Sequence, residues 1–342
     1  MKTVFHKFKD QISRIWESSK RVSVEIQPYF ESEVHELETK WGKDLHYGMK
    51  KSKHFILVGS SHSLQLICPS GKILFELAHY QRAFHLNESY FFCTDGKSLR
   101  RYELNQPQDS FIKTLSYPFV DQIELSEEGY LYMTDGSLIY VLDFDFNELG
   151  RVDPKVEFCF LQKISIKKDG TILALDRNHS QIMLWKSFDS EVCKIQKIPF
   201  VSDFIHHSLF DIYMISNGYY LEELQVYQAD ADHSASIHIM EVNGNKGLKQ
   251  KNRNSDYWEI MPQVAIHPLG KKLALIDNAG FIRVLEIKSS KIWQLWNANQ
   301  TGVAVQLMWL DENQILFINA KEELLLADTK DFSIVRFWQS NL

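Results

Sequence analysis

The chain has 342 residues, of which 44% are hydrophobic and 13% aromatic, enough for one large core or two ordinary domains. Its formal net charge of −6 argues against a protein that binds nucleic acid over its whole surface, because such proteins are normally basic. The sequence contains no apolar run long enough to cross a membrane and no signal-peptide pattern. We therefore expect a cytoplasmic protein without a transmembrane segment.

Residues 1–43 form an extension that precedes the repeats described below. Over residues 3–18, apolar side chains recur at steps of three and four, which predicts an amphipathic helix with basic residues on its other faces. A strand-like alternation over residues 22–26 and an acidic stretch over residues 31–38 follow. Such an extension either packs on the body of the protein or docks on a partner or an anionic membrane surface, and we favour packing.

From about residue 44 onward, a short phrase recurs seven times: an apolar run, a tight polar turn and a second apolar run. The steps between successive turns are 35, 40, 41, 41, 60 and 42 residues, counted from Ser60, Asp95, Asp135, Asp176, Asn217, Asp277 and Asn319. A period of about 40–45 residues with strand-rich units is typical of a β-propeller. The sequence thus predicts an all-β, seven-bladed β-propeller over residues 44–342, with six and eight blades as the alternatives.

Four of the seven turns are built on aspartate. In each, we expect the carboxylate to lie between the second and third strands of a blade and to accept nearby backbone N–H groups. The recurrence of these residues is then structural, and none of them is a catalytic acid. The four are Asp95, Asp135, Asp176 and Asp277.

Two kinds of known repeat are visible in the phrase. The segment Gly170–Trp185 resembles an NHL repeat, in which four apolar residues lead to Asp, then Asn, then Ile-x-apolar-aromatic, and Gly129–Phe144 is a looser copy. The segment Val264–Glu286 is more similar to a WD40 repeat, although the chain has neither a Gly-His dipeptide nor a Trp-Asp pair. The resemblance covers roughly residues 44–338. It implies a propeller that binds other macromolecules, because only a minority of such propellers are enzymes.

Motifs that would indicate catalysis or metal binding are scarce. No GxSxG, HExxH, Walker or GxGxxG phrase occurs, so the commonest hydrolase, zinc and nucleotide sites lack support. Asp230–His233 is interpreted as a solvated turn, and His206–His207 lacks an identifiable carboxylate partner. Glu124 and Asp203 are isolated candidates for an axial calcium site of the lactonase kind. We expect no cofactor, no metal and no catalytic residue.

The 60-residue step is the main irregularity, and it predicts a loop insertion at about residues 243–257. Insertions in repeat proteins map to loops and often to the binding face. Basic residues beside aromatic ones suit an acidic peptide, a phosphate backbone or RNA bases, although a merely tolerated insertion is the simpler interpretation. The candidate binding residues are Lys246, Lys249, Lys251, Arg253, Tyr257 and Trp258.

Together these features favour a non-catalytic, cytoplasmic, protein-binding platform of the WD40 or NHL type. Two alternatives stay open. One is a propeller hydrolase or lactonase with an axial metal, so the question of enzymatic activity is not closed by the sequence. The other is an RNA-binding protein that acts through the basic insertion.

Overall fold

The computed structural model describes most of the repeat region. The ranges described are 48–60, 62–79, 81–115, 120–191, 194–198, 201–206, 212–217, 223–229, 236–243, 263–276, 282–289, 291–296, 304–319 and 323–339. The predicted N-terminal extension over residues 1–43 lies outside them, as do Asp277 and, beyond Asn243, the predicted insertion.

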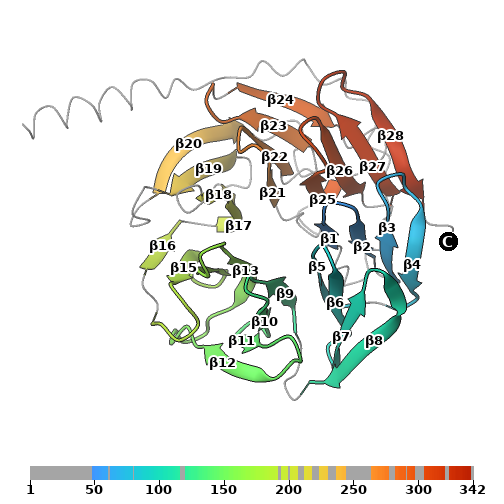
Figure 1. The fold of residues 1–342 in the computed structure, drawn as a ribbon. Coiled ribbons are helices and arrows are strands. Elements are labelled where there is room, and N and C mark those ends of the chain that lie inside the picture. Colours follow the sequence, from blue (N-terminus) through green and yellow to red (C-terminus); the bar gives the residue numbers. More distant parts are fainter. Residues whose placement is uncertain are drawn as a thin grey trace, which may run out of the picture.

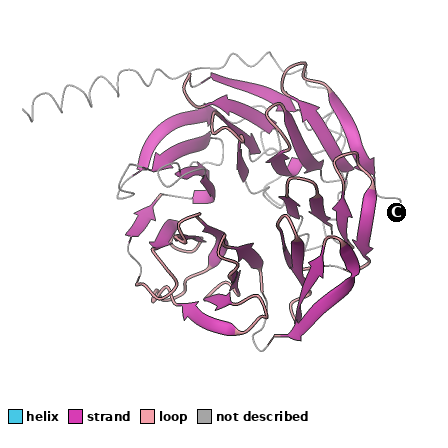
Figure 2. Ribbon diagram, in the orientation of Figure 1, coloured by secondary structure: helices cyan, strands magenta, loops and turns pink. Residues whose placement is uncertain are grey.

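The described residues form strands and no helices, arranged as seven four-stranded antiparallel sheets around one axis (Figures 1 and 2). Each sheet is one blade and consists of four strands that are consecutive in the chain. The predicted all-β, seven-bladed propeller is therefore confirmed. No helix within these residues is long and apolar enough to span a membrane.

The first three blades are β1 (Gly48–Lys51), β2 (Ile56–Gly59), β3 (Leu64–Ile67) and β4 (Ile73–Leu77); β5 (Ala83–Leu86), β6 (Tyr90–Thr94), β7 (Ser98–Glu103) and β8 (Gln106–Thr114); and β9 (Gln122–Leu125), β10 (Leu131–Thr134), β11 (Ile139–Leu142) and β12 (Glu148–Val152). Blades 4 and 5 are β13 (Leu161–Ile166), β14 (Ile172–Asp176), β15 (Gln181–Trp185) and β16 (Lys194–Lys197); and β17 (Val201–His206), β18 (Ile212–Asn217), β19 (Glu223–Ala229) and β20 (Ser236–Asn243). Blades 6 and 7 are β21 (Gln263–Ile266), β22 (Lys272–Ile276), β23 (Ile282–Glu286) and β24 (Lys291–Trp296); and β25 (Ala304–Trp309), β26 (Gln314–Asn319), β27 (Glu323–Asp328) and β28 (Ile334–Gln339).

The residue pattern of each strand follows its place in the blade. The middle strands β14 and β15 are buried along their whole length, because the neighbouring blades cover both faces of the sheet. The outer strand β4 instead alternates between half-buried and exposed residues, since one of its faces meets water. This difference is why the inner strands appear in the sequence as continuous apolar runs.

The core lies between blades, in clusters that join each blade to the next. One cluster packs Tyr132 and Val141 of blade 3 against Ile172 and Trp185 of blade 4. Another packs blade 1 against blade 7, where the ring closes, through residues such as Met49, Ile56, Leu316 and Ile318. In the described residues this closure depends on side-chain packing and not on a strand shared between blades, and blades 1 and 7 lie side by side in Figure 1.

The strand order also defines two faces of the ring. Because successive strands run in opposite directions, the turns between second and third strands lie on the same side as the connections from one blade to the next. We call this side the connection face; it carries the turns at Asp95, Asp135 and Asp176 and the connection formed by residues 153–160. The opposite face carries the other two turns of each blade, including the turn over residues 329–333 between β27 and β28.

Candidate functional site

The first strands of the seven blades surround the axis. Their pairing with the second strands shows which of their residues occupy equivalent positions along the axis, and we call each set of equivalent positions a level. One level contains the residues paired with Leu57, Phe92, Tyr132, Leu173, Tyr213, Ala274 and Leu316 of the second strands. These first-strand residues are Lys50, His85, Glu124, Ser165, Ile205, Ala265 and Met308. At this level, blades 1 to 4 are therefore polar and blades 5 to 7 apolar.

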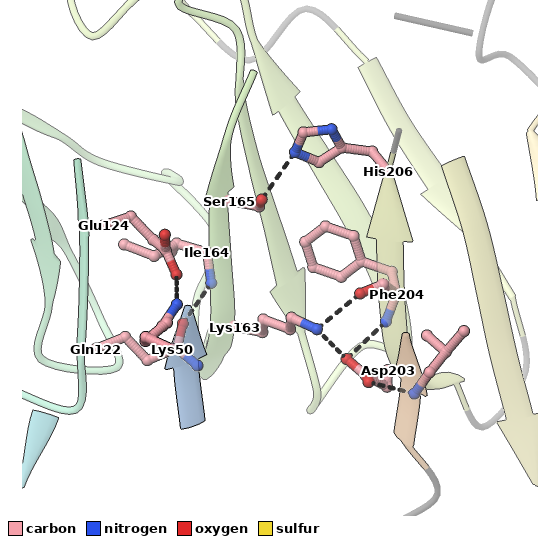
Figure 3. Close-up of polar contacts among 10 residues, drawn as sticks. Lys50, Gln122, Glu124, Lys163, Ile164, Ser165, Asp203, Phe204 and His206 are labelled. Atoms are coloured by element: carbon pink, nitrogen blue, oxygen red, sulfur yellow. Dashed lines mark hydrogen bonds and ion pairs between the residues drawn. The ribbon is translucent and has the colours of Figure 1, made fainter. Parts of the chain in front are cut away.

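Glu124 joins three blades at the axis. Its Oε1 lies 2.5 Å from Nζ of Lys50 in blade 1 (Figure 3). Its Oε2 lies 3.2 Å from Nδ1 of His85 in blade 2. The His85 contact does not meet hydrogen-bond geometry, so we count it as electrostatic. Burial acts to raise the pKa of Glu124, but Lys50 and His85 outweigh it and lower that pKa to about 2. Glu124 is therefore ionised, and its carboxylate links blade 3 to blades 1 and 2.

Asp203 links three further blades in a similar way. Its Oδ1 lies 2.6 Å from Nζ of Lys163 in blade 4 and accepts the backbone N–H of Phe204 at 2.8 Å. Its Oδ2 accepts the backbone N–H of Val264 in blade 6 at 2.9 Å. Nζ of Lys163 also donates to the carbonyl oxygen of Phe204 at 2.7 Å. Figure 3 shows these contacts linking blades 4, 5 and 6.

Similar contacts cross the remaining seams, so every neighbouring pair of blades shares at least one polar contact made by a side chain. Oε1 of Gln122 in blade 3 accepts the backbone N–H of Ile164 in blade 4 at 2.7 Å. The other contacts are Lys53 N–H to Glu88 between blades 1 and 2, Trp309 Nε1 to the Ala265 carbonyl between blades 7 and 6, and Lys51 Nζ to the Leu310 carbonyl between blades 1 and 7. These contacts link all seven blades. We call the ion pairs of Glu124 with Lys50 and of Asp203 with Lys163, which join first strands, the axial network.

The axial network does not fit a divalent metal. Nζ of a lysine lies within 2.6 Å of each axial carboxylate, where a cation would have to bind. In the part of the chain that the structure describes, no three His, Cys, Asp or Glu residues are grouped to hold a metal. Glu124 and Asp203, which the sequence offered as calcium ligands, are structural ion pairs instead.

Among the residues that the structure describes, Ser165 and His206 form one axial arrangement that resembles a nucleophile and its base. Ser165 Oγ lies 2.9 Å from His206 Nε2 (Figure 3). Burial, and then the charges of Lys167 and Lys163, lower the pKa of His206 to about 4. A base this weak is poorly matched to removing a proton from serine near neutral pH. His207 and Asp230–His233 lie outside the described residues.

The aspartates of the connection face accept backbone N–H groups. Oδ1 of Asp95 accepts the N–H groups of Lys97 and Ser98, both at 2.8 Å. Oδ1 of Asp135 accepts the N–H groups of the residues two and three positions on, at 2.8 and 2.9 Å. Both carboxylates therefore shape their own turns, in the way that short polar side chains commonly do.

Asp176 is fully buried, and it also binds residues outside its own turn. Oδ1 accepts the backbone N–H of Phe160 at 3.1 Å and that of Asn178 at 3.2 Å. Oδ2 lies 2.7 Å from Nδ1 of His179 and accepts Nε2 of Gln181 at 3.0 Å. Burial alone would raise the pKa of Asp176, but these hydrogen bonds and the His179 ring lower it. Asp176 thus connects its own turn to the connection from blade 3.

That connection, residues 153–160, carries two exposed aromatic rings. The Phe158 side chain is 86% exposed and the Phe160 side chain 38% exposed. Between them, burial and then the nearby carboxylate of Asp176 raise the pKa of the Cys159 thiol to about 12, so this thiol is not a nucleophile at neutral pH. We call Phe158 and Phe160 the aromatic pair. Sequence reasoning missed it, and the only local signal was two phenylalanines in a link between blades.

The six basic and aromatic residues predicted to bind a partner lie outside the described residues, so the geometry neither assembles nor separates them. In the sequence they fall between β20 (Ser236–Asn243) and β21 (Gln263–Ile266). A connection from blade 5 to blade 6 starts and ends on the connection face, the same face as the aromatic pair.

Comparison with known proteins shows the fold and nothing finer. No protein-family model and no curated protein sequence matches the chain. Among solved structures, it is similar to Hsv2 of Kluyveromyces lactis (14% identity, TM-score 0.56, 84% of this chain and 95% of that chain covered) and to the β-propeller domain of Cps50 (Swd1) of Myceliophteria thermophila (10%, 0.62, 82% and 96%). It is also similar to streptogramin B lyase (10%, 0.63, 81% and 91%). The predicted propeller-repeat architecture is thus confirmed, while one of these proteins is by name an enzyme.

Proposed function

We propose that the chain is a non-catalytic platform that binds other proteins in the cytoplasm. The observation that carries this proposal is the axial network: Glu124 is paired with Lys50, and Asp203 is paired with Lys163, across the blades. The axis is where a propeller enzyme would bring residues from several blades together around a substrate. In this chain those residues hold the scaffold together, which leaves the loops of the two faces to make the contacts.

The enzymatic alternative makes opposite demands on the same residues. A lactonase or hydrolase needs either a free carboxylate set for a metal or a base whose pKa lies near the working pH. Neither the lysine-paired carboxylates nor His206 meets these demands. The fold itself does not decide the matter, because similar propellers include enzymes and non-enzymes.

One experiment separates the two functions. The full chain is purified from its native cells with its partners, the partners are identified by mass spectrometry, and binding is re-measured with purified components. The same preparation is tested for hydrolysis of lactones and esters, with and without calcium. We expect stoichiometric binding of a protein and no turnover. Turnover that depends on calcium and disappears in Glu124→Gln, while circular dichroism shows a folded variant, would contradict the proposal.

A further inference from the structure

Phe158 has two features that folded proteins normally avoid. Its ring is 86% exposed, and its backbone has φ of 56°, in the left-handed region that bulky residues rarely occupy. Phe160 is 38% exposed, and its ring lies so close to Gly136 that a Cβ there would be 3.0 Å from Phe160 Cε2. Backbone strain of this kind concentrates at functional sites, where the surrounding structure maintains it.

The neighbouring turn of blade 4 maintains this conformation. Nδ2 of Asn178 donates to the carbonyl oxygen of Phe158 at 2.7 Å, across 20 positions of sequence. Oδ1 of Asp176 accepts the N–H of Phe160 at 3.1 Å, and the N–H of Arg177 donates to the carbonyl oxygen of Phe160 at 2.9 Å. The backbone of the aromatic pair is therefore fixed before any partner arrives, which reduces the entropy lost on binding.

The charges beside the aromatic pair distinguish among classes of partner. Residues 153–160 contain the acids Asp153 and Glu157 and one cation, Lys155, whose Nζ already lies 3.3 Å from Glu191. Arg177 of the neighbouring turn adds a second cation, so two acids and two cations balance, and these residues form no cluster of cations that would attract an anionic membrane or a nucleic acid. Aromatic anchors surrounded by charges of both signs are instead typical of protein interfaces.

We infer that the aromatic pair is a docking surface for a partner protein that receives the Phe158 ring in an apolar pocket. This inference rests on the platform function proposed above and names the surface that performs it. Because the ring stands out from the connection face, the complementary surface is concave. Phe158 is the anchor, and Phe160 extends the apolar contact.

The test needs a substitution that removes the ring and keeps the backbone. Phe158→Asn does so, because asparagine tolerates the left-handed region. Phe332→Asn is the matched control: Phe332 has φ of 60° and is 51% exposed, but it lies on the opposite face in a turn fixed by local contacts from Asp328 and Asp331. Neither variant should unfold at a lower temperature than the wild type, because each ring is at least half exposed and asparagine tolerates the left-handed region better than phenylalanine does.

The partner is identified by placing the photoreactive analogue benzoylphenylalanine at position 158 or 332 of the full chain in its native cells. A protein cross-linked from 158 and not from 332 is then purified and titrated with the wild type and both variants. We expect Phe158→Asn to raise the Kd on the order of 30-fold or more, as for an interface hot spot, and Phe332→Asn to leave it unchanged.

Two results would overturn the inference. If a purified partner binds Phe158→Asn as tightly as the wild type, the docking surface is refuted while the platform function stands. If phosphatidylserine vesicles bind the wild type but do not bind the Phe158→Asn variant, the Phe158 ring contacts a membrane and not a protein. A chain that binds no protein and turns over a substrate refutes the platform function itself, and the docking surface with it.

Discussion

His206 should make the protein lose stability in mild acid. The imidazole lies at the axis against Ser165, with Lys163 and Lys167 adding positive potential and Glu124 and Asp169 opposing them. Its folded-state pKa of about 4 is below the value of 6.5 for an exposed histidine. As the pH falls through 6.5, the unfolded chain therefore takes up a proton that the folded protein refuses until about pH 4, and the folded state loses free energy relative to the unfolded state.

The size of the effect follows from these two pKa values. Between pH 8 and pH 5, proton uptake by the unfolded state alone lowers the free energy of unfolding by about 2 kcal/mol. His206→Gln removes this contribution, because glutamine stays neutral and its amide can still contact Ser165. His62→Gln is the control, since His62 lies exposed in a turn.

The assay is urea unfolding of the three proteins at pH 8 and pH 5, followed by circular dichroism and tryptophan fluorescence. All other ionisable groups are the same in the wild type and His206→Gln, so their contribution cancels in that comparison. The wild type and His62→Gln should lose about 2 kcal/mol more than His206→Gln does over this range. Equal losses in wild type and His206→Gln would refute the argument, and would mean that the axis admits enough water to charge the imidazole.

Three further predictions concern the axial network, the turns and the insertion. Glu124→Gln should lower the free energy of unfolding by about 1–2 kcal/mol, because it removes the ion pair of Lys50, which is only partly exposed, and Lys50→Met in the same chain should restore part of the loss in urea unfolding. Asp95→Ala should cost about 1 kcal/mol, whereas Asp176→Ala should cost two to three times as much, since Asp176 also holds the connection between blades; equal costs would contradict this difference. In the predicted insertion, serine should replace Lys246, Lys249, Lys251 and Arg253 together. We expect the fold to stay intact and partner binding to weaken, most visibly at low ionic strength. Partner binding at full strength would show that the site lies elsewhere.

The fold could be predicted because it depends on a pattern that every blade repeats. Inner strands buried on both faces require continuous apolar runs, and the turn between them favours a short polar side chain, so the phrase recurs at each blade. The local turns at Asp95 and Asp135 follow from the same rule. Each of these features needs only residues that are close in sequence.

The site could not be predicted because its contacts join residues that are distant in sequence. Lys50 and Glu124 are 74 positions apart, and only the matched register of two first strands brings them together. Sequence reasoning selected Glu124 and Asp203 as unusual acids but had no means of finding their lysines. The strain at Phe158 likewise depends on Asn178, and no property of Phe158 itself indicates it.

One strand connects the scaffold to the proposed docking surface. At its start, β13 (Leu161–Ile166) continues from Phe160, whose N–H binds Asp176, and further along it carries Lys163, which pairs with Asp203. The aromatic pair therefore directly precedes a strand that carries one of the axial ion pairs, and does not lie at the end of a long free loop. Because the axial ion pairs hold the blades of the propeller together, the connection that carries the aromatic pair starts and ends on fixed strands. Contact residues that are fixed in this way lose less entropy on binding. Polar groups at the axis thus contribute to recognition by positioning the face, without contacting the partner.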